Sequence, residues 1–337
     1  MAGWQSEKVP SAGILHTVAA SGPGMAWAGG IAVREAGGFA TLIFRRGGQG
    51  WEQVQAPQVG RVNRLLAMSE ADVWGVGDGW SLHWDGSRWE RIPAAVIKDS
   101  EPQLFGLAQF GAGDVWAAGY APLRACRQAR GTVQHWDGAA WADLPMPDMA
   151  DVWSLSGIAG ASPTDVWAVG RIHQARGEAL ALHWDGQGWE RMPVPGAAGR
   201  SVHLADVAVL DNADVWAAGY SQASGNIGTR QLFAAHWDGR AWSRGNAAGN
   251  PGQLTQLATD GTQLWGVGYG PPGVPLAARL EDRAWKLLPG PARPPGAEHT
   301  SLHGATVLAG GSLLAVGASS MPDGSSQPLA AVRRAVC

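Results

Sequence analysis

Four side chains of this 337-residue chain could together carry out proton transfer on an anionic substrate: His16, Arg64, His203 and His303. Histidine changes charge near neutral pH, and arginine binds carboxylates and phosphates through paired hydrogen bonds. A metal-dependent version of this chemistry would use His203, His299 and His303, because neutral imidazole is a common ligand for divalent metals. We expect no cofactor, with a divalent metal as the alternative.

A second set of residues favours binding rather than reaction. Arginine attracts anionic groups, and aromatic rings provide broad contact surfaces. The candidate ligand-binding residues are Trp80, Trp153, Tyr120, Tyr220, Tyr269, Arg124, Arg127, Arg171, His173 and Arg230. Whether the members of either set can meet depends on the elements that carry them.

The chain repeats a phrase centred on tryptophan. Asp-Val-Trp recurs at regular spacing, beginning at Asp72, Asp114, Asp165 and Asp214, and degenerate copies precede and follow these. A glycine lies three residues after each anchor position. The anchors are residues 27, 74, 116, 167, 216, 265 and 314, which are 42 to 51 residues apart. Seven units of this length are typical of the blades of a β-propeller.

A second phrase, His-Trp-Asp-Gly-x-x-Trp, begins at His83, His135, His183 and His236. Asp-Gly between apolar runs predicts a hairpin, since both residues tolerate a positive φ. Each unit therefore contains four short strands, A to D. In the fifth unit we expect them near residues 204–210, 215–219, 232–237 and 241–244. We assign the four repeated histidines a structural role, such as a hydrogen bond to a backbone carbonyl.

The two ends of the chain indicate how the last unit is completed. Its strands A to C fall near residues 301–308, 312–317 and 328–336, and no fourth strand follows them. Residues 3–10, which contain Trp4, resemble the fourth strand of the first unit around Trp51. We expect this N-terminal strand to complete the last blade and close the ring, which removes open sheet edges. The predicted fold is an all-β, seven-bladed β-propeller of four-stranded blades, in a single domain over residues 1–337.

These repeats resemble those of kelch-type propellers, including the central domain of galactose oxidase. The Asp-Gly-x-x-Trp hairpin is also similar to the Asp-box of sialidase-type propellers. The resemblance covers the whole chain and implies the propeller fold. It does not imply an activity, because propellers carry many unrelated functions.

Repetition separates residues that pack blades from candidates for a site. Seventeen of the 19 tryptophans occupy repeated positions, where we expect them to pack between sheets. Trp80 and Trp153 do not, and we expect them in a B–C loop and a D–A link. In an up-and-down blade these connections share one end of the sheet. The tyrosines, the remaining histidines and the loop arginines map to that end, so the sequence predicts a functional face there.

Composition narrows the partners. The formal net charge is −3, from 25 basic and 28 acidic residues, which indicates neither a nucleic-acid nor a membrane partner. The N-terminal residues do not resemble a signal peptide, and the chain has only two cysteines. We therefore expect a cytoplasmic monomer.

Two functions remain open. The favoured hypothesis is a non-catalytic binding or scaffold protein that holds a peptide, protein or glycan on the D–A/B–C face. The alternative is an intracellular tailoring enzyme, a lyase, cyclase or oxidase, with His16, Arg64, His203 and His303 at the mouth of the central channel.

Overall fold

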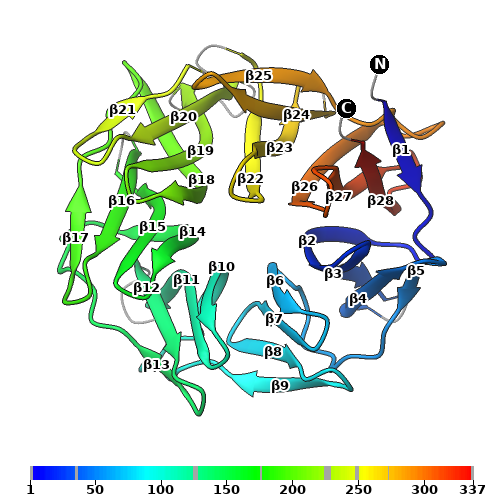
Figure 1. Cartoon of the computed structure of the whole chain (residues 1–337), viewed down its shortest axis with the longest axis horizontal. Coiled ribbons are helices and arrows are strands. Elements are labelled where there is room, and N and C mark those ends of the chain that lie inside the picture. The colour runs from blue at the N-terminus through cyan, green and yellow to red at the C-terminus, as the bar shows by residue number, and fades with distance from the viewer. Residues whose placement is uncertain are drawn as a thin grey trace. The chain divides into compact units, whose positions relative to one another are not determined.

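The computed structural model describes residues 3–34, 37–123, 128–174, 177–223, 229–246, 250–271 and 273–334. Within these ranges 28 strands form seven four-stranded sheets, each with its strands in up-and-down order (Figure 1). The predicted class, a seven-bladed β-propeller, is confirmed. In the described part of the chain no helix has the length and apolar character needed to cross a membrane.

The first three blades span residues 14–143, and each runs from strand A to strand D. Their strands are β2 (Ile14–Gly22), β3 (Met25–Val33), β4 (Phe39–Gly47) and β5 (Gly50–Gln53); β6 (Arg64–Ser69), β7 (Asp72–Val76), β8 (Trp80–Trp84) and β9 (Trp89–Pro93); β10 (Gln103–Gly111), β11 (Asp114–Leu123), β12 (Gln128–Trp136) and β13 (Trp141–Asp143).

Blades four to seven follow the same order. Their strands are β14 (Trp153–Ser162), β15 (Asp165–Ile172), β16 (Glu178–Trp184) and β17 (Trp189–Met192); β18 (Arg200–Asp211), β19 (Asp214–Ala223), β20 (Gln231–Trp237) and β21 (Trp242–Arg244); β22 (Gln253–Thr259), β23 (Leu264–Gly270), β24 (Val274–Glu281) and β25 (Ala284–Pro289); β26 (His299–Val307), β27 (Leu313–Ser320) and β28 (Ser326–Arg333), joined by β1 (Trp4–Glu7).

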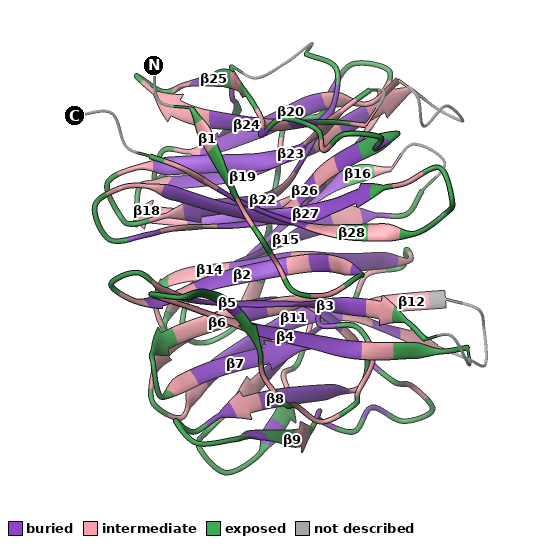
Figure 2. Cartoon of the chain, turned by 90° about the vertical axis from the view of Figure 1, so that its right-hand side faces the viewer, coloured by how far each residue is buried: buried purple, intermediate pink, exposed green. Residues whose placement is uncertain are grey.

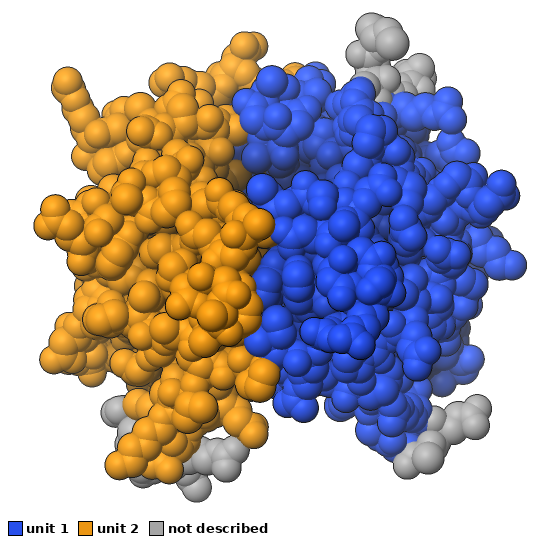
Figure 3. All heavy atoms as spheres, turned by 60° about the horizontal axis from the view of Figure 1, so that its bottom comes forward, with its two compact units in different colours: residues 1–92, 255–280, 286–337 blue, residues 93–254, 281–285 orange. Residues whose placement is uncertain are grey.

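The chain divides into two compact units, coloured separately in Figure 3. Unit 1 comprises residues 1–92, 255–280 and 286–337, and unit 2 comprises residues 93–254 and 281–285. Unit 1 contains blades one, two and seven and most of blade six, whereas unit 2 contains blades three, four and five. The assignment of residues 1–337 to a single domain stays a prediction.

The N-terminal strand completes the last blade, as predicted. β1 pairs antiparallel with β28, from Trp4 opposite Arg333 to Glu7 opposite Ala330 (Figure 1). Glu7 also reaches blade one, where its carboxylate accepts hydrogen bonds from the Arg46 guanidinium and from the Trp51 indole, the latter at 2.8 Å. Charge-assisted bonds of this kind are stronger than neutral ones, so β1 is held from both sides.

The two repeated phrases meet in one hydrogen-bonded group. In blade five, Asp214 Oδ1 lies 2.8 Å from His236 Nε2 and accepts a 2.8 Å bond from the Trp216 indole. The imidazole of His236 stacks on the Trp216 ring, with centroids 4.5 Å apart. The same pairing joins His83 to Asp72, His135 to Asp114 and His183 to Asp165. The structural role of these histidines is thus supported, but the expected carbonyl acceptor is corrected: the partner is the carboxylate of the A–B turn.

Blades one and six have an arginine at the position of this histidine. Arg45 lies opposite Trp27 and Arg279 opposite Trp265 in the sheet register, as His236 lies opposite Trp216. Their guanidinium carbons lie 5.7 Å and 5.3 Å from the indole centroids, within cation–π range. In six blades, therefore, a flat nitrogen-containing group covers the strand B tryptophan.

Strand A of five blades carries a β-bulge at the same place. A buried leucine pairs with the repeated strand B glycine, and the residue after that leucine has no partner in the register. The leucine–glycine pairs are Leu15–Gly30, Leu104–Gly119, Leu155–Gly170, Leu204–Gly219 and Leu302–Gly317. Bulges redirect side chains next to a regular ladder. The bulged residues are His16, Phe105, Ser156, Ala205 and His303, and these include two of the predicted catalytic residues.

Burial follows the sheet pattern. Figure 2 shows the middle of β3 and β4 buried and the far end of their hairpin exposed. Phe39, at the start of β4, is 60 % exposed, whereas Phe44 is fully buried. The middle of this hairpin therefore packs in the core, and its far end is available for contacts.

Candidate functional site

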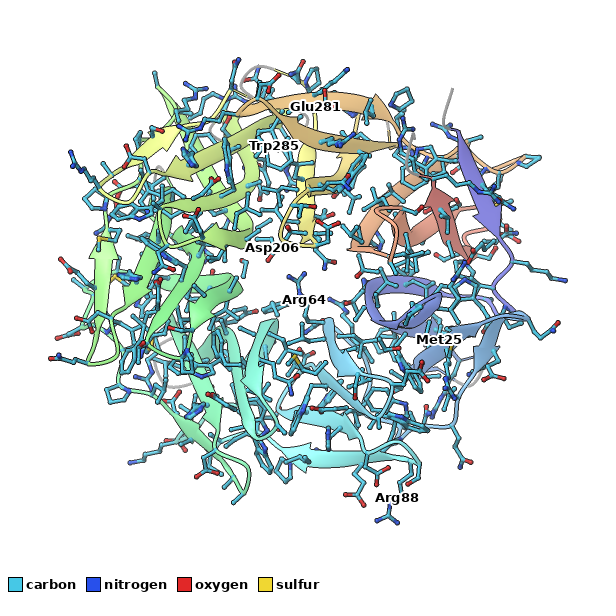
Figure 4. All side chains as sticks on the ribbon, in the orientation of Figure 1. Met25, Arg64, Arg88, Asp206, Glu281 and Trp285 are labelled. Carbon is cyan, nitrogen blue, oxygen red and sulfur yellow. The ribbon has the colours of Figure 1, made fainter. Side chains whose placement is uncertain are left out.

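The A strands of blades three, four and five lie side by side in unit 2 (Figure 1). They approach closely because glycines follow two of the bulges. A Cβ atom on Gly106 would lie 2.8 Å from the Ile158 amide, and one on Gly157 would lie 2.7 Å from Asp206 Oδ1. Asp206 itself is buried on β18 (Figure 4). This spacing brings the bulged residues of neighbouring strands, Phe105, Ser156 and Ala205, into one row.

His203 links blades four and five just before the bulge of β18. Its Nε2 lies 3.0 Å from the hydroxyl of Ser156 on β14. Its Nδ1 lies 3.5 Å from the hydroxyl of Tyr220, which is opposite it in the register. The imidazole and phenol centroids are 5.2 Å apart. The ring of His203 is thus held by two hydroxyl groups from neighbouring strands.

Arg230 covers the other side of Tyr220. Its guanidinium carbon lies 4.2 Å from the phenol centroid, a close cation–π contact. It also donates hydrogen bonds to Gln222 Oε1 at 3.3 Å and to Gln253 Oε1. Neutral acceptors position this guanidinium without neutralising its charge.

Arg171 and His173 form a similar arrangement on blade four. Arg171 Nη2 lies 3.0 Å from His173 Nδ1, and Arg171 Nε donates to His173 Nε2 at 3.4 Å. The hydroxyl of Ser154 lies 2.8 Å from the same Nε2. Arg171 is partly buried and His173 is exposed. We call the residues Arg171, His173, His203, Tyr220 and Arg230 the arginine–histidine cluster.

The charge of this cluster resides on its two arginines. Burial first, and then the charges of Arg171, His173 and Arg230, lower the pKa of His203 to about 3. Burial and Arg171 also lower the pKa of His173. Among the described residues, neither Arg171 nor Arg230 forms an ion pair with a carboxylate. The cluster therefore combines uncompensated positive charge with neutral imidazole, which favours an anionic ligand.

Unit 1 brings together two of the predicted catalytic residues. His16 and His303 are bulged residues of blades one and seven, and their rings stack with centroids 5.5 Å apart. His303 Nδ1 donates to the Leu15 carbonyl at 2.9 Å, so its Nε2 accepts from Ser301 Oγ at 2.8 Å. Burial, followed by His303 and Arg61, lowers the pKa of His16 to about 3, and burial lowers that of His303.

The other two predicted catalytic residues are Arg64 and His203. Arg64 is the first residue of β6, opposite Val76, and its side chain extends beyond the start of the strand (Figure 4). His203 belongs to unit 2 and has the partners described above. The grouping of all four residues at one site stays a prediction.

The predicted metal set, His203, His299 and His303, stays a prediction. Within the described ranges, no group of three or more His, Cys, Asp or Glu side chains is arranged to hold a metal ion. Both ring nitrogens of His303 are occupied by hydrogen bonds. His299 packs against Gly273, where a Cβ atom would lie 2.8 Å from the imidazole.

The expected positions of Trp80 and Trp153 are also corrected. Each begins a strand, β8 or β14, instead of lying in a loop, and each is only 2 % exposed. Both rings lie against glycines: a Cβ atom on Gly77 would lie 2.2 Å from Trp80, and one on Gly131 would lie 2.0 Å from Trp153. These rings fill hydrophobic cores, so we propose no ligand contact for them.

The remaining predicted residues separate. Tyr120 donates a 2.6 Å hydrogen bond to Gln103 Oε1 and lies in unit 2, whereas Tyr269 pairs with Pro275 in unit 1. Arg124 and Arg127 lie outside the described residues. Sequence reasoning did not identify Ser154, Ser156 and Phe105. The signal for the last two was the varying position after the leucine that recurs in strand A.

Comparisons with known proteins show the fold alone. No protein-family description and no curated protein sequence match this chain. Among solved structures, YCF48 bound to D1 peptide aligns at 15 % identity with a TM-score of 0.59, over 99 % of this chain and 96 % of that one. YCF48 from Cyanidioschyzon merolae aligns at 13 % identity, TM-score 0.61, over 99 % of both. The extracellular domain of a hybrid two-component system from B. thetaiotaomicron aligns at 10 % identity and TM-score 0.65, over 100 % of this chain and 40 % of that one.

The neutral histidines predict a loss of stability in acid. Because folding lowers the pKa of His16 and His203 to about 3, the unfolded chain binds more protons below its own pKa of about 6.5. Stability is therefore complete above that pH and falls as the pH decreases towards 3. Each ring should lower the free energy of unfolding by about 2 kcal/mol between pH 7.5 and pH 5. Urea unfolding at the two pH values measures the difference.

The variant His203→Gln provides the comparison. It should show a smaller difference between the two pH values, because one of the two rings no longer titrates. Equal stability of the unmodified chain at pH 7.5 and pH 5 would contradict the assignment of neutral, buried imidazoles.

Proposed function

We propose that this chain is a non-catalytic binding scaffold that holds an acidic peptide segment of a partner against the arginine–histidine cluster. The observation that carries the proposal is the setting of Arg171 and Arg230. Both guanidinium groups have neutral hydrogen-bond acceptors and, within the part of the chain that is described, no ion pair with a carboxylate. A carboxylate supplied by a ligand would neutralise the charge of these guanidinium groups and accept hydrogen bonds from them.

The properties of the histidines support binding over proton transfer. A general base works best with a pKa near the operating pH. The pKa of about 3 gives His203 little tendency to take a proton at neutral pH. Its hydrogen bonds to Ser156 and Tyr220 instead hold the imidazole ring in a fixed orientation, as a neutral group beside the arginines.

The fold is compatible with this use. YCF48, a propeller of similar architecture, was solved with a bound D1 peptide. This likeness concerns the fold, and the proposal for our chain rests on its own arginines. Connections at strand ends are also where rigid scaffolds commonly carry binding residues.

Binding of a labelled acidic peptide tests the proposal. Fluorescence anisotropy with fluorescein-labelled hexaglutamate should show saturable binding at low salt, and labelled hexalysine should not bind. Arg171→Gln should weaken hexaglutamate binding roughly tenfold, because it removes one charge-assisted contact. Arg230→Gln should have a similar effect, provided that its thermal midpoint stays close to that of the unmodified chain.

A matched control separates a site from overall charge. Arg240 is exposed in the C–D turn of blade five, at the opposite end of that sheet. Arg240→Gln removes the same charge and should leave the dissociation constant unchanged. An equal loss in Arg240→Gln and Arg171→Gln, or no binding of hexaglutamate, would overturn the proposal.

A further inference from the structure

An aromatic pair lies on the blade next to the arginine–histidine cluster. Phe105 and Tyr120 stack almost parallel, with centroids 5.8 Å apart and an interplanar angle of 16°. Both rings are only partly buried, although most large apolar side chains of unit 2 are in its cores. Phe105 is the bulged residue of β10, so the bulge directs its ring away from the regular ladder.

The one polar group of this pair, the Tyr120 hydroxyl, already forms a hydrogen bond within the protein. The Tyr120 hydroxyl donates to Gln103 Oε1 at 2.6 Å, which fixes the phenol ring. What the pair offers to a ligand is therefore the faces and edges of two rings. Such rings favour another flat apolar group in stacked or edge-to-face contact.

The aromatic pair and the cluster are close neighbours in unit 2. β10 packs directly on β14, and the absence of a side chain at Gly106 lets the two backbones approach. The bulged residue next to Phe105 on β14 is Ser156, whose hydroxyl lies 3.0 Å from His203. Arg171 pairs with Ser154 on the same strand. One strand thus separates the apolar rings from the charged groups.

We infer that the bound segment carries a carboxylate and an aromatic side chain within a few residues of each other, the carboxylate at Arg171 and the aromatic ring at Phe105 and Tyr120. This inference rests on the proposed function and specifies its ligand. In an extended peptide, side chains two residues apart point to the same side and are about 7 Å apart. A segment of this kind can therefore reach from β14 to the aromatic pair.

Four kinds of labelled heptapeptide, built on glycine and serine, test the inference. One contains a glutamate and a phenylalanine two residues apart, in either order; the second has only the glutamate, the third only the phenylalanine, and the fourth has neither. Anisotropy titrations should show that the first binds about fivefold to tenfold more tightly than the second, in at least one order. The third and fourth should bind weakly, because they lack the anion.

Variants of the protein separate the contribution of the aromatic contact from that of the carboxylate contact. Phe105→Ser should remove the advantage of the glutamate–phenylalanine peptide while leaving the glutamate-only peptide unaffected. Phe39→Ser, which changes a phenylalanine that is 60 % exposed on blade one, is the matched control and should keep the advantage. If Phe105→Ser folds poorly, Phe105→Leu keeps an apolar side chain without the ring and should reduce the advantage. Arg171→Gln should weaken both glutamate peptides equally.

The outcomes distinguish the two proposals. Equal affinity for the first two peptides, or an advantage that survives in both Phe105 variants, would overturn the aromatic inference and leave the acidic-peptide scaffold standing. Failure of both glutamate peptides and of hexaglutamate to bind would overturn both.

Discussion

Gly219→Ala is expected to lower the free energy of unfolding by about 3 kcal/mol or more. A Cβ atom at this position would lie 2.0 Å from the carbonyl oxygen of His203 and 2.8 Å from the amide of Ala205. Both neighbours are backbone atoms of the bulged strand, so relief of the overlap requires the strand pairing itself to shift. Overpacking of a well-packed interior typically costs about 1–3 kcal/mol, and a backbone neighbour places this case at the upper end.

Urea unfolding followed by tryptophan fluorescence would measure the change. Gly188→Ala provides the control, because nothing lies within 4 Å of a Cβ atom there. It should alter stability by less than about 0.5 kcal/mol. If the two variants were equally stable, the close contact between strand A and the strand B glycine would be wrong. A large loss would also reduce hexaglutamate binding, since His203 is part of the same contact.

Asp214→Ala is expected to cost about 3 kcal/mol. The substitution leaves His236 Nε2 and the Trp216 indole nitrogen without their shared acceptor. His236 is 6 % exposed and Trp216 is 1 % exposed, so the two donors lose their shared acceptor in a largely buried setting. Hydrogen bonds to charged groups contribute about 1.5–3 kcal/mol, and leaving buried partners unsatisfied adds to the cost.

Two further variants sharpen this measurement. Asp148→Ala removes an exposed aspartate of the same unit and should be nearly neutral. Asp214→Asn keeps one acceptor oxygen but loses the charge. Its loss of unfolding free energy should lie between those of Asp214→Ala and Asp148→Ala. A loss in Asp214→Ala no larger than that in Asp148→Ala would show that the carboxylate does not connect the repeated phrases.

The number of blades could be predicted because its signals are local. Asp-Val-Trp and His-Trp-Asp-Gly each lie within one turn and one strand, so they survive without knowledge of strand pairing. The completion of blade seven could also be predicted, since Trp4 matches the fourth-strand tryptophans. The bulge at Ala205 could not, because it depends on how β18 pairs with β19, and a mismatch in register leaves no mark in either strand alone.

The grouping of the site residues stays a prediction. Arg171 and Tyr220 were expected in loops, but Arg171 pairs with Ser154 within β15 and Tyr220 pairs with His203 within β19. Trp80 and Trp153 were assigned to loops because they fall outside the repeat, but strands β8 and β14 begin at these residues. Spacing along β26 also says nothing of the hydrogen bonds that occupy both ring nitrogens of His303. The kelch resemblance remains a resemblance, since no family description matches the sequence.

The bulges of strand A have a consequence for protein engineering. Five blades keep the same leucine and the same facing glycine, yet the residue between them is His16, Phe105, Ser156, Ala205 or His303. A backbone that accepts an imidazole, a benzyl ring, a hydroxyl and a methyl group at equivalent points places few demands on the side chain there. A combinatorial library confined to residues 105, 156 and 205 could therefore diversify recognition in unit 2 while leaving the residues that hold the sheets together unchanged.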